Sequence, residues 1–302
     1  MKVASFYRFL DLADPKAFRD ELQSYCDARE VLGTILVAAE GFNGTICGPE
    51  AAILEVFDWI RQRLSLETPI EARWTESDEA PFRRMRVRVK KEIVTLGRPD
   101  IQPHRQTGTY VPPAEWNSLI DNPDVLVIDT RNHYEFEVGS FPRAVDPGTD
   151  SFRQFPVFAK QLAETSRDRP LAMFCTGGIR CEKATALMLE LGFEEVYHLQ
   201  GGILRYLQET PEAENRWQGE CFVFDTRVAV DKDLAEGGYV QCHACRRPLS
   251  AEDLESPDFR EGVSCPHCVN EIDGDRAARL EERRKQVALA EQRGEKHIGQ
   301  KL

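Results

Sequence analysis

The sequence reads Cys175-Thr176-Gly177-Gly178-Ile179-Arg180-Cys181 at a point where a buried strand gives way to a helix. The apolar run before it, 171–174, is typical of a buried parallel strand, and residues 182–189 after it have helical spacing and strong helix formers. The two glycines let the backbone curl with its N–H groups turned inward, and the start of the helix adds partial positive charge. We therefore expect an anion cradle around Cys175, whose thiol ionises easily.

The length of this loop indicates which group it holds. Four residues separate Cys175 from Arg180, whereas a cysteine phosphatase needs one more to surround a phosphate. The smaller ring suits a sulfur-bound group. We expect Cys175 to act as a nucleophile, as a thiolate or a persulfide, and Arg180 to offset negative charge. The remaining residues of the active-site loop are Thr176, Gly177, Gly178 and Ile179.

Segments on both sides of the loop indicate a known family. With VLVIDTR (125–131) upstream and HLQGGILRYL (198–207) downstream, the loop resembles a rhodanese domain, whose loop cysteine carries a persulfide. The whole chain resembles the bacterial rhodanese-domain tRNA uridine hydroxylases, through EGFNGT (40–45), KKEIVTLG (90–97), GTYVPP (108–113), CTGGIRCEKA (175–184) and WQGECFVFD (217–225). This resemblance implies an oxidoreductase that uses molecular oxygen to convert the wobble uridine of tRNA to 5-hydroxyuridine. Its partner would be the anticodon loop of tRNA.

The composition is that expected of a cytoplasmic globular protein. The 302 residues suffice for two or three domains, with 41% hydrophobic and 30% charged residues. No run approaches the length of a membrane span, and the first residues start a strand rather than a signal peptide. The nine cysteines are odd in number and six fall in patterned pairs, which suits catalytic and metal-binding thiols in a reducing compartment. A net charge of -12 argues against indiscriminate nucleic-acid binding, but a local basic patch can still bind RNA.

We expect a multidomain protein of mixed α/β and α+β class. Residues 1–97 predict the order βαββαβ of a ferredoxin-like or acylphosphatase-like domain, with helices at 14–30 and 49–64 and strands at 3–10, 33–39, 45–47, 70–75 and 85–95. Residues 98–113, rich in proline, predict a linker. Residues 114–215 predict a rhodanese-like parallel sheet, with its clearest strands at 125–128, 171–174 and 196–199. Residues 216–302 predict a cysteine-rich, zinc-ribbon-like segment and a charged helical tail.

The last strand of the first domain carries a basic stripe. Because strand side chains alternate, the apolar residues 85, 87 and 89 share the core face, and the opposite face carries Arg84, Arg86, Arg88 and Lys90. Such a stripe is either a solvated face or a track for the phosphate backbone of RNA.

The EGFNGT segment predicts a turn between two strands, because Asn43-Gly44 is a strong turn dipeptide. One interpretation is simple hairpin chemistry. The other, which only the resemblance supports, is that exposed backbone N–H groups beside Glu40 and Asn43 contact the RNA substrate.

Three further residues near the loop are accessory candidates. Asp129 and Arg131 follow a predicted strand, and the carboxyl ends of such strands carry ligand chemistry. We favour a loop-fixing ion pair for these two residues. Cys181 is either a resolving thiol for a Cys175 persulfide or a packing residue. Its position at a helix start predicts a lowered pKa, but the curled loop is expected to hold the two sulfurs apart.

The last third of the chain carries two C-x2-C knuckles. Their spacing is typical of a structural, tetrahedral zinc site formed by Cys242, Cys245, Cys265 and Cys268, and unmetallated or redox-active thiol pairs are the alternative. From Asp275 to about Arg293 the sequence predicts a charged helix, either solvent-facing or an RNA arm, followed by a disordered basic end.

Three functions fit these motifs. RNA hydroxylation is implied by the resemblance, sulfur transfer to tRNA or a small acceptor by the loop chemistry, and a non-catalytic RNA-binding scaffold by the domain arrangement. An ionisable cysteine in an intact cradle argues against the scaffold. The sequence has no Rossmann fingerprint or other nucleotide-cofactor motif, and no convincing two-His-one-carboxylate iron triad. The loop does not decide between hydroxylation and sulfur transfer, so hydroxylation is what the resemblance implies. For that reaction we expect attack of the Cys175 sulfur on C6 of uracil.

Overall fold

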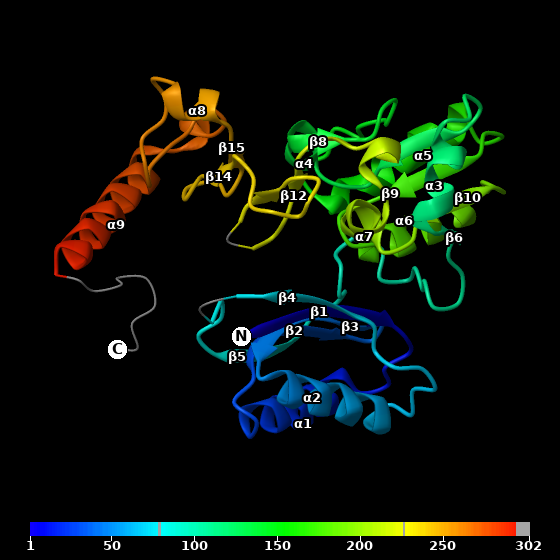
Figure 1. Ribbon diagram of the computed structural model, residues 1–302, viewed down its shortest axis with the longest axis horizontal. Coiled ribbons are helices and arrows are strands. Elements are labelled where there is room, and N and C mark those ends of the chain that lie inside the picture. The colour runs from blue at the N-terminus through cyan, green and yellow to red at the C-terminus, as the bar shows by residue number, and fades with distance from the viewer. Residues whose placement is uncertain (78–79, 226, 294–302) are drawn as a thin grey trace.

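The computed structural model describes residues 1–77, 80–225 and 227–293. Figure 1 shows an N-terminal α/β unit below a second α/β unit, with a C-terminal segment that extends sideways from the second. Within the described residues, no helix combines the length and the apolar character that a membrane crossing requires. The basic end expected after Arg293 lies outside the described residues.

The N-terminal unit is a five-stranded sheet with strand order β4-β1-β3-β2-β5. Helices α1 and α2 cover one face of this sheet (Figure 1), and they bury Phe18, Leu22 and Ile53 against it. The Asp14 side chain caps α1 by accepting hydrogen bonds from two backbone N–H groups of its first turn. The bounds are β1 Lys2–Phe9, α1 Pro15–Asp27, β2 Leu32–Ala38, β3 Gly41–Gly48, α2 Glu50–Arg63, β4 Ala72–Glu76 and β5 Met85–Val89.

The predicted acylphosphatase-like fold is confirmed, and the predicted last strand, β5, lies at the edge of the sheet, parallel to β2. The predicted turn at 40–45 is wrong, because the chain reverses at Ala39-Glu40 and Gly41–Gly48 is strand β3. The glycines serve close strand contact instead of a turn. A Cβ on Gly44 would lie 2.8 Å from the carbonyl oxygen of Thr34 on the neighbouring strand.

The last strand is also shorter than predicted, since β5 ends at Val89 rather than Thr95. The carboxylate of Glu92 accepts hydrogen bonds from the backbone N–H groups of Leu96 and Gly97, both at 3.0 Å, which holds the chain in a turn. Val89, expected in the core, is 44% exposed because it ends the strand.

The second unit is a parallel sheet with order β6-β10-β9-β7, and it matches the predicted rhodanese-like architecture. The three predicted strands appear as β7, β9 and β10. Strand β6 lies inside the stretch 98–113, which was predicted to be the linker. The bounds are β6 Thr109–Val111, α3 Pro113–Ile120, β7 Leu126–Asp129, α4 His133–Val138, β8 Gly139–Ser140, η1 Phe152–Gln154, α5 Phe155–Thr165, β9 Leu171–Phe174, α6 Ile179–Glu190, β10 Val196–Leu199 and α7 Gly202–Glu209.

The C-terminal segment begins by packing on the second unit, because β11 pairs with β8 and the side chains of Cys221 and Val223 join its core. It then forms two short hairpins, the second of which carries the first cysteine knuckle, and ends in the long helix α9 (Figure 1). The bounds are η2 Glu212–Glu214, β11 Gln218–Gly219, β12 Cys221–Phe222, β13 Ala229–Val230, β14 Val240–Gln241, β15 Pro248–Leu249, α8 Ala251–Glu255, η3 Val269–Glu271 and α9 Gly274–Gln292.

Candidate active site

The predicted cysteine loop connects β9 to α6. Cys175 directly follows β9 and is 1% exposed. Gly178 has φ +99, a conformation that favours glycine, and it turns the chain into the first residue of α6. A Cβ at Gly178 would also lie 2.9 Å from the hydroxyl of Tyr7, so the loop passes close to the N-terminal sheet.

Helix α7 fixes the orientation of this loop from outside. The backbone N–H of Ile203 donates to the carbonyl of Cys175 at 2.9 Å, and that of Leu204 donates to the carbonyl of Thr176 at 3.2 Å. With these carbonyls held outward, the N–H groups that follow turn inward. The N–H of Gly178 donates to the Cys175 sulfur at 3.1 Å. The expected cradle of N–H groups is therefore present around the sulfur.

Arg180 lies beside this cradle in a fixed position. Its guanidinium donates to the two carboxylate oxygens of Glu135, at 2.6 and 2.8 Å, and to the Thr176 hydroxyl at 3.2 Å. Glu135 is fully buried at the start of α4, where its side chain also accepts the backbone N–H of Asn132. Sequence reasoning missed Glu135, although its place three residues after Asn132 is a capping-box signal.

The surroundings of Cys175 favour its thiolate. Burial raises the pKa of the thiol, but hydrogen bonds from Cys181 and the charge of Arg180 outweigh burial and lower that pKa to about 6. The N–H groups of Cys181 and Gly178 act in the same direction. This pKa favours the thiolate form of Cys175 at neutral pH.

The pKa of Cys181, the second cysteine of the loop, differs from the prediction. Burial, followed by the hydrogen bond and the charge of Cys175, holds the pKa of Cys181 well above its ordinary value, so the expected lowering is wrong. The Cys181 thiol acts on the Cys175 thiol by lowering its pKa, and the expected separation of the two sulfurs stays a prediction. The Cys181 sulfur lies 3.5 Å from the Thr130 hydroxyl. Cys181 is thus a buried, protonated thiol that favours the Cys175 thiolate as a hydrogen-bond donor.

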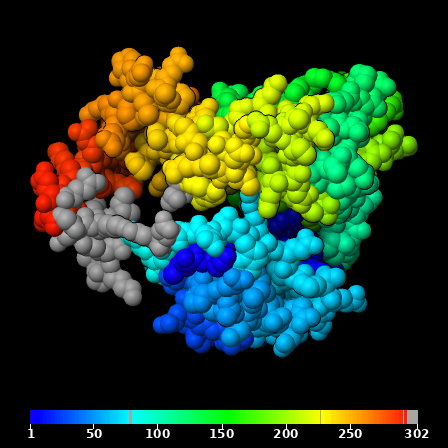
Figure 2. All heavy atoms as spheres, in the orientation of Figure 1, coloured from blue at the N-terminus to red at the C-terminus, as the bar shows by residue number. Residues whose placement is uncertain are grey.

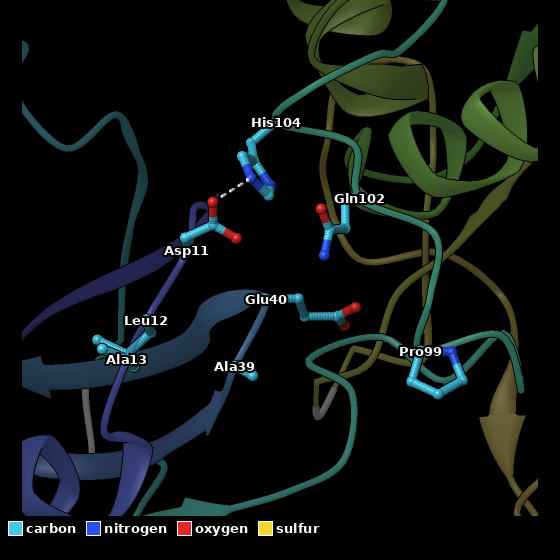
Figure 3. A pocket seen from close by; sticks show the side chains of 8 residues that line it. All are labelled: Asp11, Leu12, Ala13, Ala39, Glu40, Pro99, Gln102 and His104. Atoms are coloured by element: carbon cyan, nitrogen blue, oxygen red, sulfur yellow. Dashed lines mark ion pairs between the residues drawn. The ribbon is translucent and has the colours of Figure 1, made fainter.

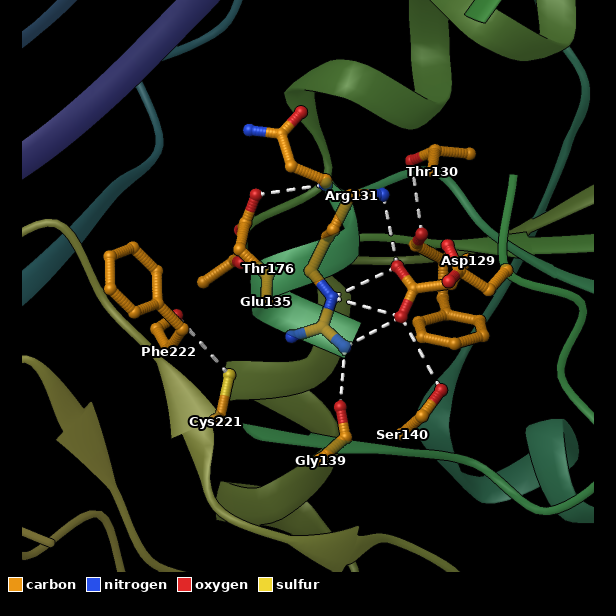
Figure 4. A network of polar contacts seen from close by, with 12 residues as sticks. Asp129, Thr130, Arg131, Glu135, Gly139, Ser140, Thr176, Cys221 and Phe222 are labelled. Carbon is orange, nitrogen blue, oxygen red and sulfur yellow. Dashed lines mark hydrogen bonds and ion pairs between the residues drawn. The ribbon is translucent and has the colours of Figure 1, made fainter. Parts of the chain in front are cut away.

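Asp129 and Arg131 form a closed ion pair beneath the loop (Figure 4). The Arg131 Nη2 atom lies 2.6 Å from the Asp129 carboxylate and also donates to the carbonyl of Gly139 at 2.6 Å. Both side chains are fully buried, and the hydroxyl of Ser140 lies 3.4 Å from the same carboxylate. The pair ties the end of β7 to β8, which fits the loop-fixing interpretation and leaves neither group facing solvent.

The N-terminal sheet contributes a tyrosine to the loop. The Tyr7 hydroxyl donates to the Glu182 carboxylate at 2.7 Å, and the Tyr110 hydroxyl is hydrogen-bonded to Glu182 as well. Burial raises the pKa of Glu182 above its usual range, despite these hydrogen bonds. Sequence reasoning missed this cluster. Strand alternation was the available signal, because Phe6 lies in the core and Tyr7 must face the other way.

A buried ion cluster joins the two α/β units next to the loop. The Lys183 ammonium lies 2.6 Å from the carboxylates of Glu40 and Glu92 and 3.3 Å from the carbonyl of Val94. Glu40 is 6% exposed, and its other oxygen accepts the N–H of Ile93 at 2.6 Å.

Glu40 and Asn43, predicted to flank exposed backbone N–H groups that contact RNA, use their side chains for contacts within the protein, and an RNA contact at this segment stays a prediction. The Glu40 carboxylate is buried and committed to Lys183, and the Asn43 amide donates to the carbonyl of Ile93 at 3.1 Å. Both residues connect the N-terminal sheet to the chain that leaves it.

Comparisons with known proteins cover the whole chain. Residues 1–93 match the UPF0176 acylphosphatase like domain, and residues 112–209 match the Rhodanese-like domain. A solved rhodanese-like domain from Anabaena sp. covers 36% of this chain and 78% of its own, with 16% identity and a TM-score of 0.31. The "tRNA uridine(34) hydroxylase" of Teredinibacter turnerae is 50% identical over 297 residues, which are 98% of this chain and 92% of that protein. That of Agrobacterium fabrum is also 50% identical, over 98% of this chain and 94% of its own.

The chain belongs to the tRNA uridine(34) hydroxylase family.

In this hydroxylase-family protein the face of the N-terminal sheet opposite α1 and α2 carries a row of polar side chains, next to the apolar cluster of Phe9, Ala38 and Ile93. Strand pairing aligns side chains from all five strands in one row across this face, and Ser5 and Thr45 within the row lie 2.9 Å apart through their hydroxyls. A basic residue stands at each end. The row consists of Arg73, Ser5, Thr45, Thr34 and Arg86.

The predicted basic stripe lies at one edge of this face. Arg86 and Arg88 belong to β5 and point away from the core, whereas Arg84 precedes the strand and Lys90 follows it. Arg84, Arg88 and Lys90 are exposed and Arg86 is half-buried. Arg73, which the sequence analysis did not single out, adds a cation at the opposite edge of the sheet.

A pocket of about 250 Å³ lies away from the cysteine loop, between the N-terminal sheet and the chain that follows it (Figure 3). His104 Nε2 lies 3.1 Å from the Asp11 carboxylate at its mouth, and Glu40 reaches it from the side. No residue of 175–180 lines it.

The four knuckle cysteines of this hydroxylase-family protein come together in the C-terminal segment. The sulfur atoms of Cys242, Cys245, Cys265 and Cys268 all lie within 4.8 Å of one another. Four thiolates at such spacing match the donor set and tetrahedral geometry of a structural zinc ion. The residues present therefore fit a metal ion, which would contribute folding energy and leave no coordination position open for catalysis.

Proposed function

We propose that the protein hydroxylates uridine 34 of tRNA at C5, with molecular oxygen as co-substrate. Identity of 50% over 98% of the chain to named tRNA uridine(34) hydroxylases carries this proposal. The buried Cys175, with a pKa of about 6, supports it because the thiol supplies a nucleophile at neutral pH.

In the proposed reaction the Cys175 sulfur forms a bond to C6 of uracil, and the electron pair of the C5–C6 double bond moves to C5. The carbon at C5 then bonds to one atom of dioxygen. The second oxygen atom leaves as water, with two protons and two electrons from an external reductant. Loss of the C5 proton and of the Cys175 sulfur restores the double bond. The loop N–H groups and Arg180 offset the negative charge that develops on the way.

For substrate binding we propose the polar face of the N-terminal sheet. Arg73, Arg86 and Arg88 on that face can neutralise backbone phosphates in a chain whose net charge is -12. The Tyr7 contact with Glu182 joins this face to the cysteine loop. An anticodon loop suits the site because its bases are already unpaired and leave their stack at low cost. The proposed compartment is the cytoplasm, where tRNA is modified.

Mass spectrometry of nucleosides tests this function directly. tRNA incubated with the protein, a reductant and oxygen should yield a uridine that is heavier by one oxygen atom, and the product should vanish without oxygen. A sulfur-for-oxygen exchange, favoured by the rhodanese-like loop, would instead identify a sulfurtransferase. An unchanged nucleoside pool would support a binding scaffold.

Replacing the nucleophile tests the mechanism separately. Cys175→Ala should abolish the oxygen gain and retain tRNA binding in a gel-shift assay, because the proposed phosphate contacts lie on the other domain. Full product formation by this variant would rule out the covalent step.

A further inference from the structure

We propose that Phe224 is the stacking platform for the base of the target uridine at the Cys175 loop. This inference rests on the proposed function and assigns a substrate-binding role to a residue of the C-terminal segment. Phe224 is 70% exposed, the highest exposed fraction of any large apolar side chain within the described residues. An aromatic ring held in water beside a buried nucleophile has a surface that a flat ligand can cover.

The Phe224 ring lies beside Arg180, the last residue of the cysteine cradle. The guanidinium carbon of Arg180 is 5.8 Å from the centre of the Phe224 ring. Arg180 cannot swing further over the ring, because Glu135 holds its guanidinium through two hydrogen bonds. A base stacked on Phe224 would therefore stand next to the group that offsets charge in the proposed reaction.

Two other aromatic rings support the position of the Phe224 ring. Phe222 packs edge-to-face against Phe224 at 5.1 Å, and Tyr134 packs against Phe222 in the same manner at 5.2 Å. The backbone around it is tied by the hydrogen bond from Val223 N–H to the Val228 carbonyl, at 2.8 Å. Contacts of this kind limit the conformations of the ring, which lowers the entropy that is lost when it binds a planar ligand.

The surroundings favour a nucleotide over other flat ligands. Arg73, at the edge of the polar sheet face, lies near enough to Asp225 to influence its pKa. In Figure 2 the yellow segment 217–225 lies above the cyan edge of the N-terminal unit. A base stacked on Phe224 would thus place its phosphates toward the basic residues of that face. Aromatic stacking beside cations is how proteins hold single-stranded nucleotides.

The test compares two anticodon stem-loop RNAs, one with uridine at position 34 and one abasic there, in a fluorescence binding assay with the full chain. The wild-type protein should bind the uridine form about 10-fold more tightly, the contribution of one stacked base. Phe224→Ala and Phe224→Leu should bind both RNAs equally, whereas Phe224→Tyr should keep the preference. Leu54→Ala, which alters a 47% exposed apolar residue on α2, is the matched surface control and should also keep it.

Two results would overturn the proposal. One is an unchanged uridine preference in Phe224→Ala, and the other is a Phe224→Leu variant that behaves as wild type, since leucine is apolar but cannot stack. Alkylation of Cys175 by iodoacetamide should be unaffected in all variants, and its loss in Phe224→Ala would show that the ring positions Arg180 instead. The binding assay does not depend on turnover. If the protein prefers the uridine RNA through Phe224 but does not hydroxylate it, the stacking role of Phe224 stands and only the proposed function is refuted.

Discussion

At the scale of single residues, the chemistry of the loop depends on partners that a linear reading does not reveal. Cys175 and Arg180 could be predicted, because a cysteine between a strand and a helix with two glycines has few other uses. Glu135 and Glu182 could not be assigned, since each gains its role from a side chain far away in the sequence. The same holds for Cys181, whose buried position reverses the effect of a helix start.

The low pKa of Cys175 can be measured by its reaction with iodoacetamide, followed by mass spectrometry. The rate should rise as pH increases through about 6 and level off above, because only the thiolate reacts. Cys181→Ala should move this midpoint upward, since the thiol that donates to the sulfur is lost, and Cys181→Ser should move it less.

Cys221 is an internal control for that experiment, because burial raises its pKa to about 12 and it should stay unmodified in the folded protein. A midpoint that is identical in wild type and Cys181→Ala would contradict the donor role of Cys181.

At the scale of elements, apolar runs correctly predicted the strands of the second unit. In the N-terminal unit, glycines led to a wrong prediction of a turn at 40–45. Residues 126–129, 171–174 and 196–199 form β7, β9 and β10, close to their predicted bounds. Gly41 and Gly44 sit inside β3, where they allow close contact with neighbouring strands. A turn and a close strand contact require the same residue, so sequence alone does not distinguish them.

The two knuckles should hold about one zinc ion per chain, measurable by atomic emission on protein purified without chelator. Cys242→Ser should release that zinc and make 240–272 sensitive to protease, because a structural zinc ion contributes on the order of 10 kcal/mol in isolated knuckle peptides. The matched control is Cys47→Ser, which alters a buried cysteine of β3 and should leave the zinc content unchanged. Metal-free wild-type protein with intact knuckles would contradict the assignment.

At the scale of the whole molecule, an ion cluster couples the two α/β units. Lys183→Met should lower the free energy of unfolding by about 3–5 kcal/mol in urea titrations, because it leaves the carboxylates of Glu40 and Glu92 buried without their cation. Adding Glu40→Gln should recover part of that loss.

Arg63→Met is the control for this prediction, since it breaks an exposed pair with Glu21 and should leave the urea midpoint unchanged. Equal stability of Lys183→Met and wild type would mean that water reaches the cluster. Small-angle scattering of the variant should show a larger radius if the two units separate.

The bonds from α7 to the carbonyls of Cys175 and Thr176 constrain how this loop evolves. A lineage that changed from sulfur to phosphate chemistry would have to add a residue before Arg180. That insertion would push the carbonyls away from Ile203 and Leu204 unless the start of α7 shifted with it. An insertion in the loop would therefore need a matching change at the start of α7, a segment distant in the sequence. The two hydrogen bonds thus make the length of the loop difficult to change by a single insertion.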